Sequence, residues 1–151
     1  MTDATPAVRL FTIGFTKKTA REFFTRLREA HVRRVVDIRL NNASQLAGFT
    51  KKDDLAFFLQ EIGGIDYVHR PDLAPTEEIL AGYKKKAIGW PEYEMQFNAL
   101  LAERHIETLV SPQEMDLACL LCSEPTPAKC HRRLVAEYLR RAWPNLTVTH
   151  L

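Results

Sequence analysis

The chain has 151 residues, 46% of them hydrophobic and 26% charged, a composition typical of one globular domain. Its formal net charge of +2 excludes strong attraction to nucleic acid by overall charge, and its apolar runs are too short to span a membrane. An odd count of three cysteines argues against a disulfide framework and favours a reducing, cytoplasmic compartment. We expect residues 1–8 to form a flexible tail and residues 9–151 to form a single α/β domain.

The first half of this domain shows alternating strand and helix signals. Residues 10–14 are apolar and end in glycine, which predicts a first strand. Thr19 and Glu22 have the spacing of a capping box, so a helix is predicted to begin there. Residues 35–38 are apolar apart from one aspartate and predict a second, buried strand.

The alternation continues to the end of the chain. Thr50 and Asp53 predict the start of a second helix. The pair Gly63-Gly64 should end that helix, because glycine readily adopts the left-handed conformation found at helix ends. The later elements are predicted as a strand at 65–69, helices at 76–86 and 91–104, a strand at 117–122, a helix at 127–142 and a strand at 146–150.

This order of elements predicts a Rossmann-like, three-layer αβα sandwich with a mostly parallel five-stranded sheet. Right-handed crossovers favour the strand order 3-2-1-4-5, with the switch point between the first and fourth strands. Ligands of such sheets bind at the carboxyl ends of the strands. The residues that follow the strands are therefore the first candidates for a site.

Polar residues do gather after the predicted strands. Gly14 ends the first strand, Asp37 and Arg39 lie at the end of the second, and Cys122 and Glu124 at the end of the fourth. Because the first and fourth strands are expected to be neighbours, Gly14 and Cys122 should lie close together. Asp37 and Arg39 share one face, and both a structural ion pair and a ligand contact stay open for them.

The segment that runs from Cys122 to Arg132 is the most informative part of the chain. Thr126 and Pro127 are a favourable cap and first position for a helix, which would place Cys130 and His131 in its first turn or just beyond. A helix N-terminus and neighbouring cations favour anions and lower the pKa of a thiol. This pattern is typical of a site for an anionic ligand, for a reactive thiolate, or for both.

Our leading hypothesis is therefore an enzyme or enzyme-derived domain that binds a small anionic or nucleotide-like ligand and uses cysteine chemistry. A thiolate would be the nucleophile, a histidine would carry the proton, and arginines would contact the anion. An acidic residue would orient the histidine or an arginine. The catalytic candidates are Cys130, Cys122, His131 and Asp37, and the ligand-binding candidates are Gly14, Arg39, Glu124 and Arg132.

Two other functions stay open. Basic clusters such as Lys84–Lys86 leave room for a non-catalytic module that binds nucleic acid or a nucleotide, although such clusters are more often solvated surface. The two cysteines and His131 could serve a metal or redox sensor. However, the seven residues between Cys122 and Cys130 exceed the spacing of structural zinc pairs, and a fourth ligand is not evident. We therefore expect no metal and no cofactor, while the oligomeric state stays open.

Four short segments stand out together: Thr12-Ile13-Gly14, Asp37-Ile38-Arg39, Gly64-Ile65-Asp66-Tyr67-Val68-His69, and Leu121-Cys122-Ser123-Glu124 followed by Cys130-His131-Arg132. In combination they resemble the domain of unknown function 488 family. The ending Cys-x-Glu…Cys-His-Arg is the most specific of them, and the similarity runs from about Leu10 to His150. The resemblance implies a compact, cytoplasmic α/β protein and lends no established activity.

The chain departs from that family at two places. Phe15-Thr16 stand where members commonly have a histidine and a serine, so a histidine base from this loop is lacking. Leu73-Ala74-Pro75 replace a glycine-rich turn, which puts a close approach of ligand to backbone there in doubt.

Overall fold

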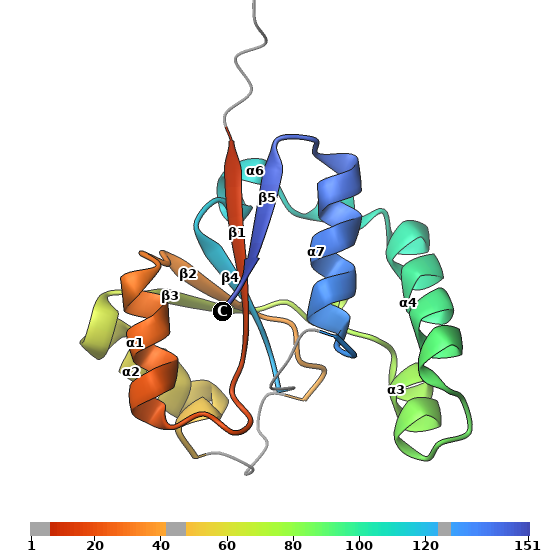
Figure 1. The fold of residues 1–151 in the computed structure, drawn as a ribbon, viewed down its shortest axis with the longest axis horizontal. Helices are drawn as coiled ribbons and strands as arrows, with labels where there is room; N and C mark the ends of the chain where they lie inside the picture. Colours follow the sequence, from red (N-terminus) through yellow and green to blue (C-terminus); the bar gives the residue numbers. More distant parts are fainter. Residues whose placement is uncertain (1–6, 42–47, 124–127) are drawn as a thin grey trace, which may run out of the picture.

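The computed structural model describes residues 7–41, 48–123 and 128–151. Within these ranges five strands form one sheet in which every pair is parallel, as the alternating pattern predicts (Figure 1). The strand order is β3-β2-β4-β1-β5. The strands are β1 (Val8–Gly14), β2 (Arg34–Asp37), β3 (Asp66–His69), β4 (Ala118–Cys122) and β5 (Leu146–His150).

The predicted strand order 3-2-1-4-5 is wrong in one respect, because β4 lies between β1 and β2. All five residues of β4 are buried, and the strand pairs with β1 on one side and with β2 on the other. The crossover rule fixes the hand of a connection and not how many strands it passes. The connection from β1 to β2 thus leaves a gap that β4 fills, and β5 covers the outer side of β1.

The helices also follow the predicted pattern, with two short additions before β4. None of the helices in the described part of the chain is long and apolar enough to cross a membrane. The helices are α1 (Ala20–Glu29), α2 (Lys52–Gly63), α3 (Glu77–Lys84), α4 (Trp90–Arg104), α5 (Ile106–Leu109), α6 (Pro112–Met115) and α7 (His131–Ala142), with 3-10 turns η1 (Gly48–Thr50) and η2 (Pro71–Leu73).

Two of the predicted helix ends are confirmed. The Thr19 hydroxyl accepts a hydrogen bond from the Glu22 amide at 3.1 Å, and the Glu22 carboxylate accepts one from the Thr19 amide, which completes the capping box of α1. Helix α2 ends at Gly64, whose φ of 61° lies in the left-handed region that glycine adopts without a steric penalty.

Two predicted helix starts are wrong. Thr50 is the last residue of η1, and α2 begins after Lys51 with no side-chain cap, so Thr50 does not cap it. Helix α7 begins at His131, and Cys130 is its N-cap residue in an extended conformation. The preceding residues 128 and 129 form a turn, which delays the helix beyond the start predicted at 127; residues 126 and 127 themselves lie outside the described part.

The core consists of two apolar clusters, one on each side of the sheet. Helices α1 and α2 pack with Leu121 in one cluster, and α4 and α7 pack with Leu120 in the other. Figure 1 shows the two helix pairs on opposite sides of the strands. Successive side chains of a strand point to opposite faces, so β4 contributes to both clusters, which explains why it is apolar at every position.

Candidate functional site

The carboxyl ends of the central strands bring several predicted site residues together. Gly14 pairs in register with Cys122, so the predicted proximity of these two residues is confirmed. Asp37 pairs with Leu121 on one side and with His69 on the other, which places it at the same edge of the sheet. Glu124 lies outside the described residues.

The sulfur atoms of Cys122 and Cys130 meet at this edge. The two cysteines form a disulfide, and their Cα atoms lie 7.6 Å apart. Both residues are buried, with 1% and 3% of their surfaces exposed. The argument from the cysteine count did not anticipate this bond, which forms because the start of α7 returns to the end of β4.

Arg132 contacts both sulfur atoms. Its side chain is buried, with 1% of the residue exposed. Its Nη1 donates to the Sγ of Cys122 at 3.3 Å and to the Sγ of Cys130 at 3.8 Å, while its Nε donates to the Thr12 hydroxyl at 3.3 Å. A guanidinium in this position favours the thiolate form of either cysteine once the disulfide is reduced.

Asp37 holds Arg39 in a fixed orientation. The carboxylate of Asp37 is fully buried and accepts hydrogen bonds from Nε and Nη2 of Arg39 at 2.9 and 2.8 Å. The Tyr67 hydroxyl donates to the same carboxylate, and Nη2 of Arg39 also donates to the Thr50 carbonyl. Asp37 and Arg39 therefore form the ion pair that was one of the two possibilities left open by the sequence.

The third guanidinium nitrogen of Arg39, Nη1, takes no part in this network. Nη1 is buried and has no hydrogen-bond partner among the described residues. The guanidinium lies over the Phe15 ring, 5.3 Å from its centroid, which fixes its plane. Because a buried polar group without a partner is costly, an acceptor at Nη1 would be strongly favourable.

His131 is held as a neutral imidazole. Its Nε2 lies 2.7 Å from the Ile38 carbonyl oxygen, which can only accept, so Nε2 carries the proton. Burial, and to a smaller extent the Arg132 charge, lowers the pKa of His131 to about 4, although the bond to Ile38 and the nearby Asp37 act in the opposite direction. At neutral pH the ring is therefore a weak base.

Arg39, Cys122, Cys130 and His131 line a pocket of about 370 Å³, a volume suited to a small ligand, whereas Gly14, Asp37 and Arg132 lie outside its lining. It contains three cationic side chains and four aromatic ones, and none of the described residues that line it is acidic. The cations are Arg39, Lys84 and Lys129, the aromatic residues are Phe15, Tyr83, Trp90 and Tyr93, and the cysteine–histidine group is Cys122, Cys130 and His131.

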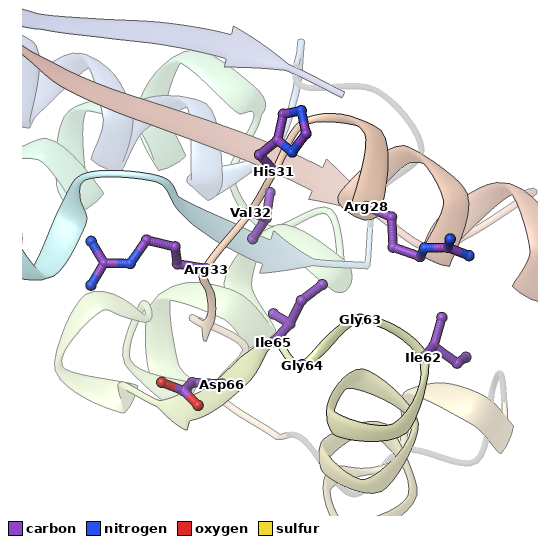
Figure 2. Close-up of a pocket in the computed structure, with 9 residues that line it drawn as sticks. All are labelled: Arg28, His31, Val32, Arg33, Ile62, Gly63, Gly64, Ile65 and Asp66. Atoms are coloured by element: carbon purple, nitrogen blue, oxygen red, sulfur yellow. The ribbon is translucent and has the colours of Figure 1, made fainter.

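A second hollow, of about 600 Å³, lies at the opposite end of the strands, where β2 and β3 begin. Figure 2 shows that its charged side chains, Arg28, Arg33 and Asp66, extend in different directions and do not converge on one point. The end of α2 around Gly64 also lines this hollow. We therefore regard the cysteine pocket as the better candidate site.

Sequence reasoning missed several members of the site. Tyr67 lies on β3, which pairs with β2, and its hydroxyl donates to the carboxylate of Asp37, the last residue of β2. Trp90 and Tyr93 have helical spacing, but aromatic residues at such spacing are equally typical of a helix face that packs in the core. Thr12 gave no signal beyond its place in a strand, although its hydroxyl contacts both Arg132 and the Nδ1 of His150, at 3.3 and 2.6 Å.

Comparisons with known proteins agree with the resemblance seen in the sequence. Neither the curated proteins nor the solved structures contain a match to the chain. One family model, described as "Domain of unknown function DUF488", matches residues 19–139. This stretch runs from the cap of α1 into α7 and includes the two cysteines, His131 and Arg132. The chain therefore belongs to the DUF488 family.

Proposed function

We propose that this protein binds a small anionic, nucleotide-like ligand in the cysteine pocket and acts on it with a thiolate. The observation that carries the proposal is Nη1 of Arg39, a buried cationic donor at the pocket that has no acceptor among the residues that the structure describes. A ligand phosphate or carboxylate would supply that acceptor in a charge-assisted hydrogen bond. The lysines at positions 84 and 129 add positive charge, and no described lining residue opposes them.

The aromatic side of the pocket supports a ligand that carries a planar ring. Trp90 and Tyr93 stack with their ring centroids 5.1 Å apart, and Tyr83 lies edge-on to Trp90 at 5.7 Å. Tyr93 is buried, whereas Tyr83 and Trp90 are half-buried and offer part of their ring surfaces to the pocket. A nucleobase gains about 1–3 kcal/mol from contact with such rings.

The thiolate would come from the reduced cysteine pair. Cys130 is the N-cap residue of α7, where unpaired amides and the helix dipole favour negative charge. Cys122 lies closer to the Arg132 guanidinium. In this proposal Arg132 stabilises the thiolate, Arg39 binds the anion and Asp37 positions Arg39. His131 would accept a proton only weakly, because its pKa is lowered to about 4.

Isothermal titration calorimetry with inorganic phosphate and with nucleoside monophosphates tests the proposal. Replacing Arg39 with Gln should weaken binding about 10- to 100-fold, because a hydrogen bond between charged groups contributes about 1.5–3 kcal/mol. Arg33→Gln is the matched control, because Arg33 is exposed and does not line this pocket. Equal loss in both variants, or no loss in Arg39→Gln, would contradict the proposal.

Because Arg39→Gln removes the partner of a buried carboxylate, a second variant keeps the test decisive. Lys129→Gln changes an exposed side chain at the pocket rim and leaves the ion pair intact. It should weaken phosphate binding several-fold without changing the urea unfolding midpoint. Trp90→Leu should reduce the affinity for nucleoside monophosphates and leave that for inorganic phosphate unchanged, which separates recognition of the ring from recognition of the anion.

A further inference from the structure

The pocket contains a group of side chains that could bind a metal ion. The ligand atoms of Cys122, Cys130 and His131 all lie within 4.8 Å of one another. In a tetrahedral zinc site the Zn–S and Zn–N distances are about 2.3 and 2.0 Å, which places neighbouring ligand atoms within about 4 Å of one another. Once the disulfide is reduced, small movements of the two thiols would complete this arrangement.

The hydrogen bonding of His131 suits a metal ligand. Its Nε2 donates to the Ile38 carbonyl, so the lone pair is on Nδ1. Metal-binding histidines commonly donate their second ring nitrogen to a backbone carbonyl or carboxylate, which fixes the tautomer and the ring plane. The Phe97 ring meets the imidazole edge-on at 5.6 Å and restrains it further.

The charges at the site also favour a dication with an anion beside it. Two thiolates neutralise a divalent ion, and the Arg132 guanidinium then leaves one positive charge. An anionic fourth ligand would bring the total to zero. Cys122, Cys130 and His131 all line the pocket, so the fourth coordination position would face the cavity that Arg39 also lines.

We infer that the reduced protein binds one zinc ion through Cys122, Cys130 and His131, with an open fourth position that faces the anion pocket. Two thiolates and an imidazole are ligands that zinc prefers, and three protein ligands with one open position are typical of catalytic zinc sites. The inference deepens the proposed function, because the metal would hold the thiolates and contact the same anion.

The balance of the reaction defines the conditions for the test. An external dithiol reduces the disulfide, so the S–S bond breaks, the protein gains two thiols and the reagent becomes a disulfide. Binding of Zn²⁺ then replaces the two thiol protons, which are released to the buffer. The reduced protein should therefore be freed of reductant and titrated anaerobically.

Titration with Co²⁺ gives a direct readout of the ligands. The reduced wild-type protein should bind one equivalent and develop thiolate-to-cobalt charge-transfer absorption in the near ultraviolet, which one equivalent of Zn²⁺ should abolish. Cys130→Ser and His131→Gln should each weaken binding at least tenfold. Cys119→Ser is the matched control, because Cys119 is a free, buried cysteine in the middle of β4, outside the cluster, and should leave the titration unchanged.

Failure of the reduced wild-type protein to bind Co²⁺, or equal binding by wild type and Cys130→Ser, would overturn the inference. Poor folding of a variant cannot produce either result, because the first concerns the wild-type protein and the second requires the variant to bind Co²⁺ as well as the wild type does. The Arg39→Gln variant separates this inference from the proposed function: it should lose phosphate binding and keep the cobalt spectrum. If Arg39→Gln loses phosphate binding but the reduced wild-type protein binds no Co²⁺, the proposed function stands and the zinc site is refuted.

Discussion

Acid should destabilise the protein through His131. Burial, the main cause, lowers the pKa of this residue from an ordinary value of 6.5 to about 4. Between these two values the unfolded chain binds a proton that the folded protein does not, so stability is lost as the pH falls from 6.5 towards 4. Above pH 6.5 both states are neutral at this position, and His131 then contributes no pH dependence.

The size of the effect follows from the two pKa values. One pKa unit corresponds to about 1.4 kcal/mol, so a fall from pH 7.5 to pH 5 should cost about 2 kcal/mol through His131. In urea unfolding this loss would lower the midpoint by about 1 M. The assay is urea denaturation at the two pH values, without reductant so that the disulfide stays formed, for wild type and for His131→Gln.

His131→Gln can still donate to the Ile38 carbonyl but has no titrating ring. It should therefore lose about 2 kcal/mol less than wild type over the same pH interval. His31→Asn is the control, because His31 is exposed and asparagine tolerates its φ of 59°. If His131→Gln and wild type lose equal stability between pH 7.5 and pH 5, the reasoning about His131 is refuted.

Three further predictions address the ion pair, a helix end and the thiols. Asp37→Asn should lower the free energy of unfolding by about 3–5 kcal/mol in urea, because it leaves a buried guanidinium without its carboxylate; a loss below about 1 kcal/mol would argue against that role. Gly64→Ala should lower the free energy of unfolding by about 1 kcal/mol in the same assay, because the φ of Gly64 is 61°, in the left-handed region. Gly48→Ala is the control and should be nearly neutral, because an added Cβ meets no atom within 4 Å at either glycine and Gly48 has no such φ. Equal losses of stability in the two variants would contradict this interpretation. In the reduced, metal-free protein, iodoacetamide should label Cys130 at neutral pH, because Cys130 lines the pocket, whereas Cys119 lies in the middle of β4, where burial raises the pKa of its thiol. Mass spectrometry of the labelled peptides checks this order, and labelling of Cys119 before Cys130 would contradict it.

Local sequence signals predicted most of the elements but not the arrangement of the sheet. A capping box at Thr19 and a glycine at 64 act through neighbouring backbone atoms, so their effect can be read from a few residues. The apolar run of β4 showed that the strand is buried on both faces. It could not show which strands it pairs with, because an apolar strand fits equally well at either place in a parallel sheet.

The candidate site was located from the strand ends, whereas its chemistry needed the structure. The sequence placed Cys122 and Gly14 at one edge, and their register confirms this. It could not reveal that Arg132 turns toward the sulfur atoms, nor that Nη1 of Arg39 is left without an acceptor among the described residues. Both facts depend on the packing of side chains from α7 and from the residues that follow β2, which no local pattern encodes.

The central place of β4 has a consequence for how the protein folds. Strands β1 and β2 are never neighbours, so the first part of the chain to be synthesised cannot close a sheet by itself. Both strands pair with β4, which lies more than half the chain further on, and β1 also pairs with β5 near the end of the described residues. Contacts of such long sequence separation slow folding, and they leave apolar strand edges exposed during synthesis. We expect nascent chains that stop before residue 118 to be unable to form the native sheet and to be prone to aggregation.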